Sequence, residues 1–572
     1  MGCIIGWYFY LSRGVDAIDP TEAAVSAAGE PWEAQSLFEL LSRAARYGDR
    51  TALQVSRGGQ WTRLSYRELL AFAEARGREL AAAGLARGER ALLVADASPE
   101  WGVAYFAIMS QGATAVPLDP QLNPPDIAAI AARTRARVWL VSKAVRERLG
   151  DAVGEARLFV VDQSSSAPAE TAGETGRGEV SGNDLASIPF TSGTTLAPKG
   201  VPLTHGNFLA DLRALLAVVK VRREDEFLSV LPLYHVLGFT GGFLAPLSVG
   251  ATVTFVERLT PKALLEAMQA TRTTVIISVP RLMILLVRAI QARAAGSPRS
   301  AQLVFAVLLA LARVCRRLGA RGLRAALFRG VHTRFGGRLR MLVSGGAALP
   351  SEVYDLLDLM GFTVCEGYGL TETSPVLTLN PPHAPRRGTV GLPLPGVEVR
   401  IGDPDAEGLG EVLVRGACVF AGYLEDPAAT ARAFHDGWFR TGDLGRLERD
   451  GHLVLAGRAD DVIVTGGGKN VYPVEVEYLY RDLPHVKELC IVGVPDPASG
   501  GDAVHAVITL DDSDESPETR KREIGAAVSE ISKRIPPHQR VRGVHFWEGE
   551  LPRTSTLKVK RKQVRERIGN RE

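Results

Sequence analysis

The residues best suited to chemistry lie between Phe190 and Gly200, where the chain reads Phe-Thr-Ser-Gly-Thr-Thr-Leu-Ala-Pro-Lys-Gly. Hydroxyl groups, glycines and a lysine in one short stretch can surround an anion with hydrogen-bond donors. The stretch is not a Walker-type P-loop, because Pro198 stands where that pattern requires glycine and Gly200 follows the lysine. The same composition is typical of a surface turn. The residues alone therefore indicate either a phosphate-binding loop of another kind or a turn.

Three later stretches place glycines next to groups that bind nucleotides. Ser344–Pro350 reads Ser-Gly-Gly-Ala-Ala-Leu-Pro, Glu366–Thr373 contains Tyr-Gly-Leu-Thr-Glu, and Gly437–Leu444 ends in Thr-Gly-Asp-Leu. Small residues let a planar base lie on the backbone, and a carboxylate can accept hydrogen bonds from two ribose hydroxyls. Each stretch alone is compatible with a turn. Their order and spacing favour one nucleotide site assembled from several segments.

Two further stretches contain polar or charged side chains that could have a chemical role. Tyr234-His235 follows an expected strand over Phe227–Leu231, although a histidine in such a place is more often a structural hydrogen-bond partner. The glycines and apolar residues after His235 favour a space for an acyl chain. Leu551–Lys562 is strongly basic, and basic tails are usually solvated.

Together these motifs resemble those of the adenylate-forming superfamily, which includes acyl-CoA synthetases, luciferases and the adenylation domains of peptide synthetases. The family loop usually reads T-S-G-T-T-G-x-P-K-G, and Leu196 replaces one of its glycines here. The family's C-terminal motif reads L-P-[KR]-T-x-x-G-K, and Leu557 replaces its glycine. The resemblance runs from roughly Trp32 to Lys562, with six motifs in the family's order.

The resemblance implies a role for each motif and the use of ATP, Mg²⁺ and CoA. It assigns catalysis to Lys558, Lys199, His235, Thr371 and Glu372. It assigns the metal ion to Thr194 and Glu372, an oxygen ligand set that suits Mg²⁺. It assigns nucleotide or CoA binding to Thr191, Ser192, Gly193, Thr194, Thr195, Gly345, Gly346, Ala347, Glu366, Gly367, Tyr368, Thr371, Asp443, Arg458, Gly466, Gly467 and Lys469. It assigns the acid substrate to Tyr234, His235, Gly238, Phe239 and Gly241, and an interdomain hinge to Asp460.

The implied activity is a two-step, ATP-dependent ligation of a carboxylic acid to CoA through an acyl-adenylate, and the expected acid is a long-chain fatty acid. A flexible ammonium such as that of Lys558 would bridge the reacting carboxylate and the α-phosphate. Three alternatives stay open: an aryl or medium-chain acid, transfer to a carrier protein in place of CoA, and a non-catalytic relative that binds acyl or nucleotide ligands. Leu196 and Leu557 are the features that favour the last.

To hold these motifs, strands and helices must alternate along the chain. Expected strands over Arg90–Ala95, Thr114–Pro117 and Val138–Val141 alternate with helices over Glu100–Gly112 and Pro125–Thr134, which predicts an α/β fold with parallel or mixed sheets covered by helices. The expected domains are a disordered or weakly anchored start (1–31), a large N-terminal domain (32–456), a hinge (457–461) and a small α+β C-terminal domain (462–572). The large domain is expected to contain a basic helical insertion (about 283–335) and a small β subdomain (about 388–455).

Composition limits the possible partners and compartment. The chain has 572 residues with a net charge of +3, so no nucleic-acid binding is expected. Its five cysteines form no C-x-x-C pair, which indicates reduced thiols in a cytoplasmic protein. The apolar start, Met1 to Leu11, is shorter than the ~20 residues needed to span a bilayer. The sequence does not indicate an oligomeric state.

The stretch Met268–Ser351 contains arginines but no Asp or Glu. Ser297-Pro298 is expected to begin a helix with Leu303, Val307, Leu311, Val314 and Leu318 on one face and Arg313, Arg317, Arg321 and Arg324 on another. Such a helix can lie at the inner membrane surface as a peripheral contact. It can equally pack on the protein core like any surface helix.

Overall fold

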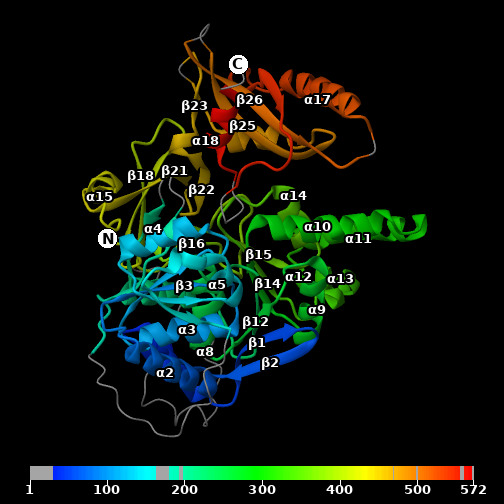
Figure 1. The fold of residues 1–572 in the computed structure, drawn as a ribbon. Helices are drawn as coiled ribbons and strands as arrows, with labels where there is room; N and C mark the ends of the chain where they lie inside the picture. Colours follow the sequence, from blue (N-terminus) through cyan, green and yellow to red (C-terminus); the bar gives the residue numbers. More distant parts are fainter. Residues whose placement is uncertain are drawn as a thin grey trace, which may run out of the picture.

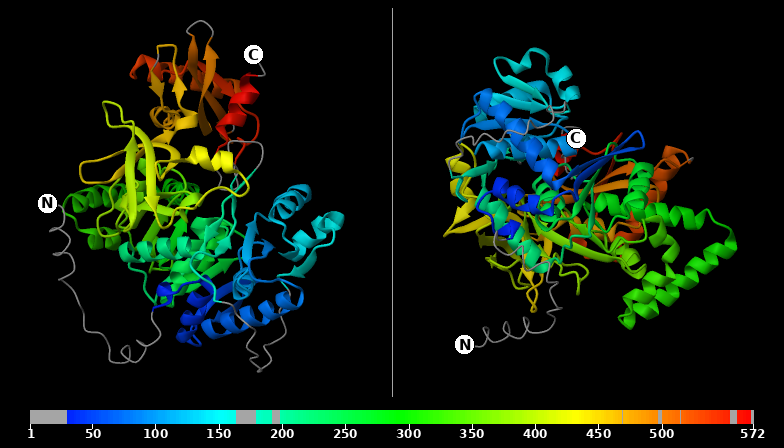
Figure 2. Two further views of the ribbon diagram at one scale, coloured as in Figure 1. Left: turned by 90° about the vertical axis from the view of Figure 1, so that its left-hand side faces the viewer. Right: turned by 90° about the horizontal axis from the view of Figure 1, so that it is seen from below.

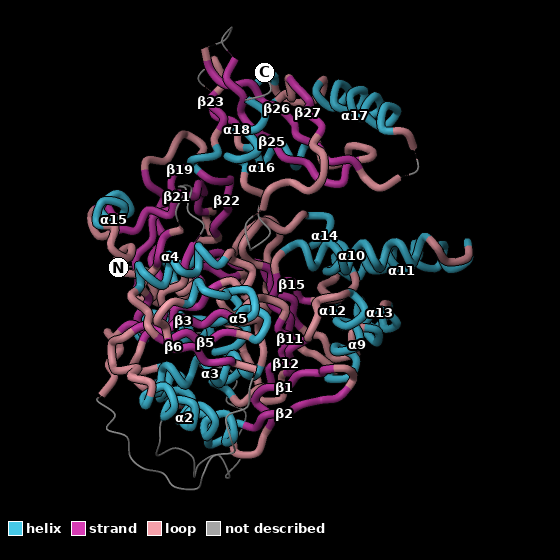
Figure 3. The backbone as a smooth tube through the Cα atoms, in the orientation of Figure 1, coloured by secondary structure: helices cyan, strands magenta, loops and turns pink. Residues whose placement is uncertain are grey.

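The structure is a computed structural model that describes residues 30–162, 179–191, 198–467, 469–496, 500–513, 515–553 and 559–569. The chain forms a large lobe and a smaller C-terminal lobe that sits on one end of it (Figure 1). Strands gather inside the large lobe and helices lie outside them (Figure 3). Within these residues no helix is long and apolar enough to cross a membrane.

A nine-stranded sheet forms the centre of the large lobe, in the order β17-β16-β15-β14-β13-β11-β12-β1-β2. Strands β12, β11, β13, β14 and β15 are parallel, whereas the edge strands pair antiparallel. The expected parallel arrangement is therefore correct for the interior of the sheet. The bounds are β1 Thr51–Arg57, β2 Gln60–Ser65, β11 Glu226–Ser229, β12 Thr252–Val256, β13 Val275–Ser278, β14 Met341–Ser344, β15 Thr363–Gly369, β16 Val376–Leu379 and β17 Leu392–Pro393.

A second, six-stranded sheet has the order β10-β7-β4-β3-β5-β6, and a two-stranded ribbon, β8-β9, lies next to it in sequence. The strands predicted near residues 90, 114 and 138 are present as β3, β4 and β5 and pair in parallel. The bounds are β3 Arg90–Val94, β4 Thr114–Leu118, β5 Val138–Val141, β6 Arg157–Val160, β7 Leu185–Ser187, β8 Phe190–Thr191, β9 Lys199–Gly200 and β10 Leu203–Thr204.

Helices cover both sheets and begin where the sequence supplies caps. Ser65 and Glu68 form a reciprocal capping box at the start of α2, as the Ser-x-x-Glu pattern predicts. The helices of this part are α1 Leu37–Ala44, α2 Tyr66–Ala82, α3 Pro99–Ser110, α4 Pro124–Thr134, α5 Lys143–Leu149, α6 His205–Val218, α7 Val236–Phe239, α8 Ala245–Val249, α9 Pro261–Thr271 and α14 Ser351–Leu359. A π-helical turn, η5 (Thr240–Leu244), joins α7 to α8.

The basic insertion consists of four helices rather than one. They are α10 Pro280–Ala295, α11 Arg299–Arg317, α12 Arg321–Leu327 and α13 Arg329–Arg334. The green α10–α11 hairpin projects from the side of the large lobe, as the view from below also shows (Figure 2). The expected helix start near Pro298 is correct, but Arg321 and Arg324 belong to α12, because the chain leaves α11 at Leu318.

The predicted β subdomain is a five-stranded sheet with β18 Val397–Gly402, β19 Gly410–Gly416, β20 Phe434–His435, β21 Trp438–Leu447 and β22 Leu453–Arg458, next to α15 Pro427–Ala433. The small lobe contains β25 Val486–Asp496, β26 Gly501–Leu510 and β27 Gly543–Phe546 in one sheet, with the hairpin β23 Ile463–Val464 and β24 Asn470–Val471. Its helices are α16 Pro473–Leu479, α17 Pro517–Ser532 and α18 Arg561–Gly569. This is the α+β unit that the sequence predicts.

Candidate active site

Several predicted motifs meet at one edge of the nine-stranded sheet. Tyr234-His235 follows β11, Gly345-Gly346 follows β14, and β15 ends at Gly369 just before η6 (Thr371–Thr373), which carries Glu372. These strands are parallel, so their carboxyl ends lie at the same edge. Ligands of open α/β sheets bind in the crevice at this edge. Segments more than 100 residues apart in sequence are thereby brought to one place.

A chain of three polar side chains joins the large sheet to the β subdomain. The hydroxyl of Tyr368 donates to Oδ2 of Asp443 at 2.7 Å, and Nη1 of Arg458 donates to Oδ1 of Asp443 at 3.1 Å. Asp443 and Arg458 also face each other as backbone partners in β21 and β22. Burial, followed by the charge of Asp443, raises the pKa of Tyr368, so this phenol stays a donor. An aromatic ring, a carboxylate and a guanidinium held together can bind a nucleoside with its phosphate.

A second group brings Lys199 to Glu372 through Tyr423. The Nζ of Lys199 lies 4.7 Å from the centre of the Tyr423 ring, and the Tyr423 hydroxyl donates to Oε1 of Glu372 at 2.9 Å. Burial raises the pKa of Glu372, and the Tyr423 hydrogen bond and the charges of Arg458 and Lys199 partly offset that rise. A buried carboxylate next to cations that suit phosphate fits a Mg²⁺ ligand.

Glu366 lies on β15, the strand that also carries Tyr368. The backbone N–H of Leu349 donates to its Oε2 at 3.2 Å, yet burial raises the pKa of Glu366 to about 7. The side chain therefore changes charge near neutral pH. Gly346 beside it has φ +83°, a backbone region that favours glycine, so the turn after β14 depends on that residue.

The residues predicted to bind the acid divide into two groups. The rings of Tyr234 and His235 lie together, with centroids 4.5 Å apart, and Gly238 lies against the carbonyl of Pro232. A Cβ built on Gly241 would meet Cδ1 of Ile277 at 3.1 Å. These residues border the sheet edge described above.

Phe239 is not brought to the acid site with the others. It is 3% exposed and packs in the core among aromatic rings, with its ring centre 4.5 Å from that of Tyr105 and 5.4 Å from that of Phe208. The neighbouring Phe243 is fully buried in the same cluster. The apolar residues after His235 that favoured an acyl space thus mainly fill the core on the other side of the helix.

Eight predicted residues fall outside the described part of the chain or in the small lobe. Ser192, Gly193, Thr194 and Thr195, and likewise Lys558, lie outside the described residues. Thr191 and Lys199 lie on either side of residues 192–197, and they pair with each other in the β8–β9 ribbon. Gly466, Gly467 and Lys469 lie in the turn of the β23–β24 hairpin, where the Thr465 hydroxyl donates to the carbonyl of Lys469 at 3.0 Å.

The remaining predicted residues occupy the expected segments. A Cβ built on Gly345 would lie 2.9 Å from Cδ2 of Leu237, and Ala347 lies in the turn that follows. Gly367 lies close to Leu379 of β16. Thr371 begins η6 next to Glu372, and Asp460 lies in η7 (Ala459–Asp461), directly after β22.

Sequence reasoning missed Tyr423, Leu237 and Ile277. Tyr423 is 51 residues from the carboxylate that it contacts, and Leu237 and Ile277 look like ordinary core residues. The one available signal was the position of Leu237, two residues after His235 on the same helical segment.

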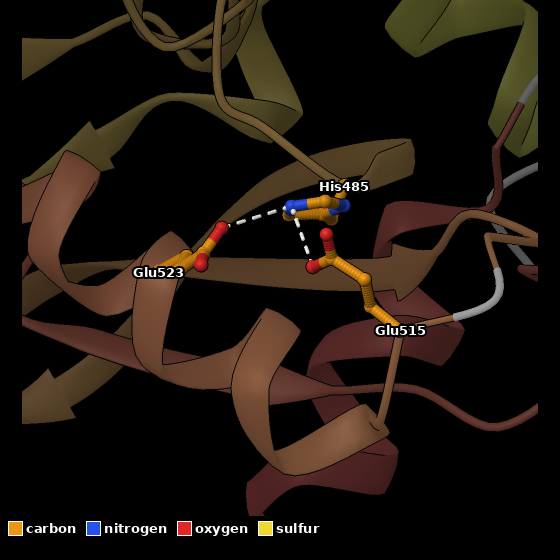
Figure 4. A group of neighbouring side chains, drawn as sticks. All are labelled: His485, Glu515 and Glu523. Atoms are coloured by element: carbon orange, nitrogen blue, oxygen red, sulfur yellow. Dashed lines mark hydrogen bonds and ion pairs between the residues drawn. The ribbon is translucent and has the colours of Figure 1, made fainter.

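A separate polar cluster lies in the small lobe (Figure 4). Nε2 of His485 lies 3.0 Å from Glu523 and 3.5 Å from Glu515, and its Nδ1 lies 3.7 Å from Asp511. Among the described residues this is the group whose side chains come close enough to share a metal ion. Because carboxylates already surround both ring nitrogens, we attribute to His485 the role of holding α17 against the start of β25.

The comparisons with known proteins agree with this geometry. The AMP-binding enzyme family matches residues 40–424, and the C-terminal domain of AMP-binding enzymes matches residues 475–558. A long-chain-fatty-acid–CoA ligase, FadD15 of Mycobacterium bovis, is 31% identical over 90% of this chain and 92% of its own length. A feruloyl-CoA synthase of Amycolatopsis is 29% identical over 91% of this chain and 96% of its own length. The crystal structure of ATP-bound MatB from Rhodopseudomonas palustris covers 92% of this chain and 98% of MatB with a TM-score of 0.74 at 26% identity.

The chain therefore belongs to the AMP-binding enzyme family, whose members form adenylates. At that level it is an AMP-forming acyl-CoA ligase with ATP and CoA as substrates and Mg²⁺ as the metal ion that accompanies ATP. Glu372 would hold that ion, which would offset the charge of the phosphates when bound.

Proposed function

We propose that this ligase activates a long-chain fatty acid. In the first step a carboxylate oxygen attacks the α-phosphorus of ATP, which forms acyl-AMP and releases pyrophosphate. In the second step the thiol of CoA attacks the acyl carbonyl and loses its proton, which forms the thioester and releases AMP. No protein nucleophile is required, so the residues act by positioning and by electrostatic stabilisation.

The observation that carries the proposal is the aliphatic border of the acid site. The side chains nearest to a Cβ built on Gly241 are those of Ile277 and Leu237. No charged or hydroxyl group is among these nearest atoms. Burial of an alkyl chain against such aliphatic side chains is favourable. These side chains offer no hydrogen-bond partner to a second carboxylate or to a phenol. The name of the FadD15 relative agrees with a fatty acid substrate.

The roles of the residues follow from their placement. We assign adenine and ribose to Tyr368 and Asp443, with Arg458 beside them, and the phosphates to Lys199 and the adjoining loop. We assign the acid's carboxylate to the pocket next to Tyr234 and His235. Lys558 would supply the ammonium that bridges the reacting groups in the first step.

The test is pyrophosphate release and thioester formation with straight-chain acids from C2 to C18, ferulate, indoleacetate and malonate, each with and without CoA. The proposal predicts the highest kcat/KM with the long straight chains and equal amounts of pyrophosphate and thioester. A preference for ferulate or malonate would contradict the alkyl substrate. Release without thioester would point to a carrier-protein acceptor, and no release with any acid would support a non-catalytic binding protein.

A further inference from the structure

The outer face of α11 is an uncovered apolar stripe. Its side chains expose between 47% and 77% of their surface. They are Leu303, Val304, Val307, Leu311, Val314 and Leu318. Their spacing of three and four residues places them along one side of the helix. An apolar row of this length on the surface usually marks a place where something else binds.

The stripe is distinct from the face that holds α11 to the protein. Ala312 is buried in a hydrophobic cluster with Phe328 and Leu357, against which Phe305, Leu308 and Leu309 pack. The rings of Phe305 and Phe328 lie edge to face, with centroids 5.9 Å apart. Because this inner face already accounts for the attachment of the helix, packing against the core does not explain the outer stripe. The expectation of an ordinary surface helix therefore describes only the inner face.

Arginines flank the stripe without carboxylate partners. Arg299 lies one turn before Leu303, and Arg317 lies one turn after both Arg313 and Val314. All three are exposed, and within the described ranges none of them forms an ion pair. Their neighbours Arg316 and Arg324 do pair, with Asp355 and Asp358. Unpaired positive charge of the described residues thus adjoins the stripe along α11.

We propose that α11 docks this protein on the surface of an anionic phospholipid bilayer. The stripe would enter the boundary between headgroups and acyl chains, and Arg299, Arg313 and Arg317 would contact lipid phosphates. An amphipathic helix with arginines beside its apolar face binds such a surface because apolar burial and charge attraction add. The α10–α11 hairpin that carries the stripe projects from the side of the large lobe (Figures 1 and 2).

Charge complementarity favours a lipid surface over a second copy of the chain. No Asp or Glu occurs between Ala267 and Ser351, whereas the same stretch carries 14 arginines. Two copies that joined their stripes would bring rows of arginine together with no carboxylate of the insertion between them, and like charges oppose such contact. An anionic bilayer offers both the apolar interior and the phosphates that this face lacks.

The experiment measures sedimentation of the full chain with vesicles, in the absence of acid, ATP and CoA. One set of vesicles contains phosphatidylcholine with about a third phosphatidylglycerol, and the other contains phosphatidylcholine alone. The stripe variant combines Leu303→Gln, Val307→Gln and Leu311→Gln, and the arginine variant combines Arg299→Ala, Arg313→Ala and Arg317→Ala. The control for the stripe variant is Leu447→Gln, and the control for the arginine variant combines Arg432→Ala and Arg449→Ala. Both replace exposed residues of the same types in the β subdomain.

The wild-type protein and the controls should bind the anionic vesicles, and each α11 variant should lose roughly tenfold or more in affinity. Added salt should weaken wild-type binding, and neutral vesicles should bind less. Unchanged binding of both α11 variants, or no binding by the wild type, would overturn the proposal. Dimers of the wild type in sedimentation velocity that the stripe variant abolishes, without vesicle binding, would assign the face to a second copy. Because no substrate is present, the result does not depend on the proposed acid specificity.

Discussion

At the scale of single residues, the site combines groups whose charge state depends on their neighbours. Tyr423 contacts both the Lys199 ammonium and the Glu372 carboxylate, so one phenol links two segments that the sequence separates by more than 170 residues. Its hydroxyl favours the ionised form of Glu372, the form that can bind a metal ion. We therefore treat Tyr423 as a positioning residue.

Tyr423→Phe should lower the rate of pyrophosphate release about tenfold, since a hydrogen bond to a charged group contributes about 1.5–3 kcal/mol. Without the donor the pKa of Glu372 should rise, so the acidic limb of the pH–rate profile should move to higher pH. The measurement is pyrophosphate release between pH 5.5 and 9. Tyr354→Phe is the control, because its hydroxyl donates only a long bond of 3.4 Å to Pro385. If the pH–rate profile of Tyr423→Phe matches that of wild type, the Tyr423 hydroxyl does not affect the pKa of Glu372.

The raised pKa of Glu366 should make the free energy of unfolding decrease as the pH rises. Burial raises its pKa to about 7 in the folded chain from 4.5, the ordinary value of a glutamate side chain, so between these two pH values the folded state binds the extra proton. The stability that this proton supplies is fully present below about pH 4.5 and is lost as pH rises through about 7. Above that pH the folded protein contains a buried carboxylate.

Glu366→Gln should remove this dependence while keeping an acceptor for the Leu349 N–H. Relative to wild type, the variant should gain stability from pH 5 to pH 8, by up to about 3 kcal/mol from the size of the shift. The measurement is the free energy of unfolding in urea at several pH values without ligands. The exposed Glu352→Gln on α14 is the control and should show no such trend. If the free energies of unfolding of Glu366→Gln and wild type differ by the same amount at every pH, the raised pKa of Glu366 is contradicted.

At the scale of elements, local signals in the sequence predict most bounds. The Ser65–Glu68 box, the prolines that begin α3 and α4, and the apolar runs of β3, β4 and β5 place those elements within one or two residues. Local hydrogen bonds and fixed φ angles determine such features, so they can be read without tertiary structure. Residue order along parallel strands likewise predicts which motifs meet at the sheet edge.

Features that depend on packing between distant segments could not be predicted. The helical period of α11 identifies an apolar face, but only the structure shows that the face packed on the core is that of Ala312 and the exposed one that of Leu303 and Val307. The same holds for Phe239, whose type and position after His235 suit either a substrate or a core contact. Tertiary neighbours decide such cases, and no period or spacing encodes them.

The segment of α7 and η5 should control the length of acid that the site accepts. Gly241→Leu would extend a side chain toward Ile277 and Leu237, the border that we assign to the alkyl chain. It should lower kcat/KM for C16 about tenfold or more and leave that for C4 within about threefold, because short acids do not reach this border. Equal losses for both acids would mean that the variant disturbs the fold or the carboxylate site instead. The two acids measured on the same preparation provide the control.

At the scale of the whole molecule, the C-terminal segment contacts both the small lobe and η7. Arg561 pairs with Glu477 of α16 at 2.5 Å and with Asp461 of η7 at 3.7 Å. Arg553 and Val559, which are described on either side of residues 554–558, form a bridge. The small lobe joins the large lobe through η7, directly after the Arg458–Asp443 ion pair. Rotation about η7 would carry Lys558 with the small lobe.

Lys558→Ala and Asp460→Pro should separate the two half-reactions. If Lys558 acts only while the adenylate forms, Lys558→Ala should abolish pyrophosphate release yet leave thioester formation from supplied acyl-adenylate within about threefold of wild type. Asp460→Pro fixes a backbone angle at the hinge, so it should spare pyrophosphate release and slow thioester formation. Both are measured by rapid quench, with Lys560→Ala as the control for loss of a nearby positive charge. Loss of both half-reactions in Lys558→Ala would contradict a rotating lobe, because a lysine that is needed in each step cannot leave the site between them.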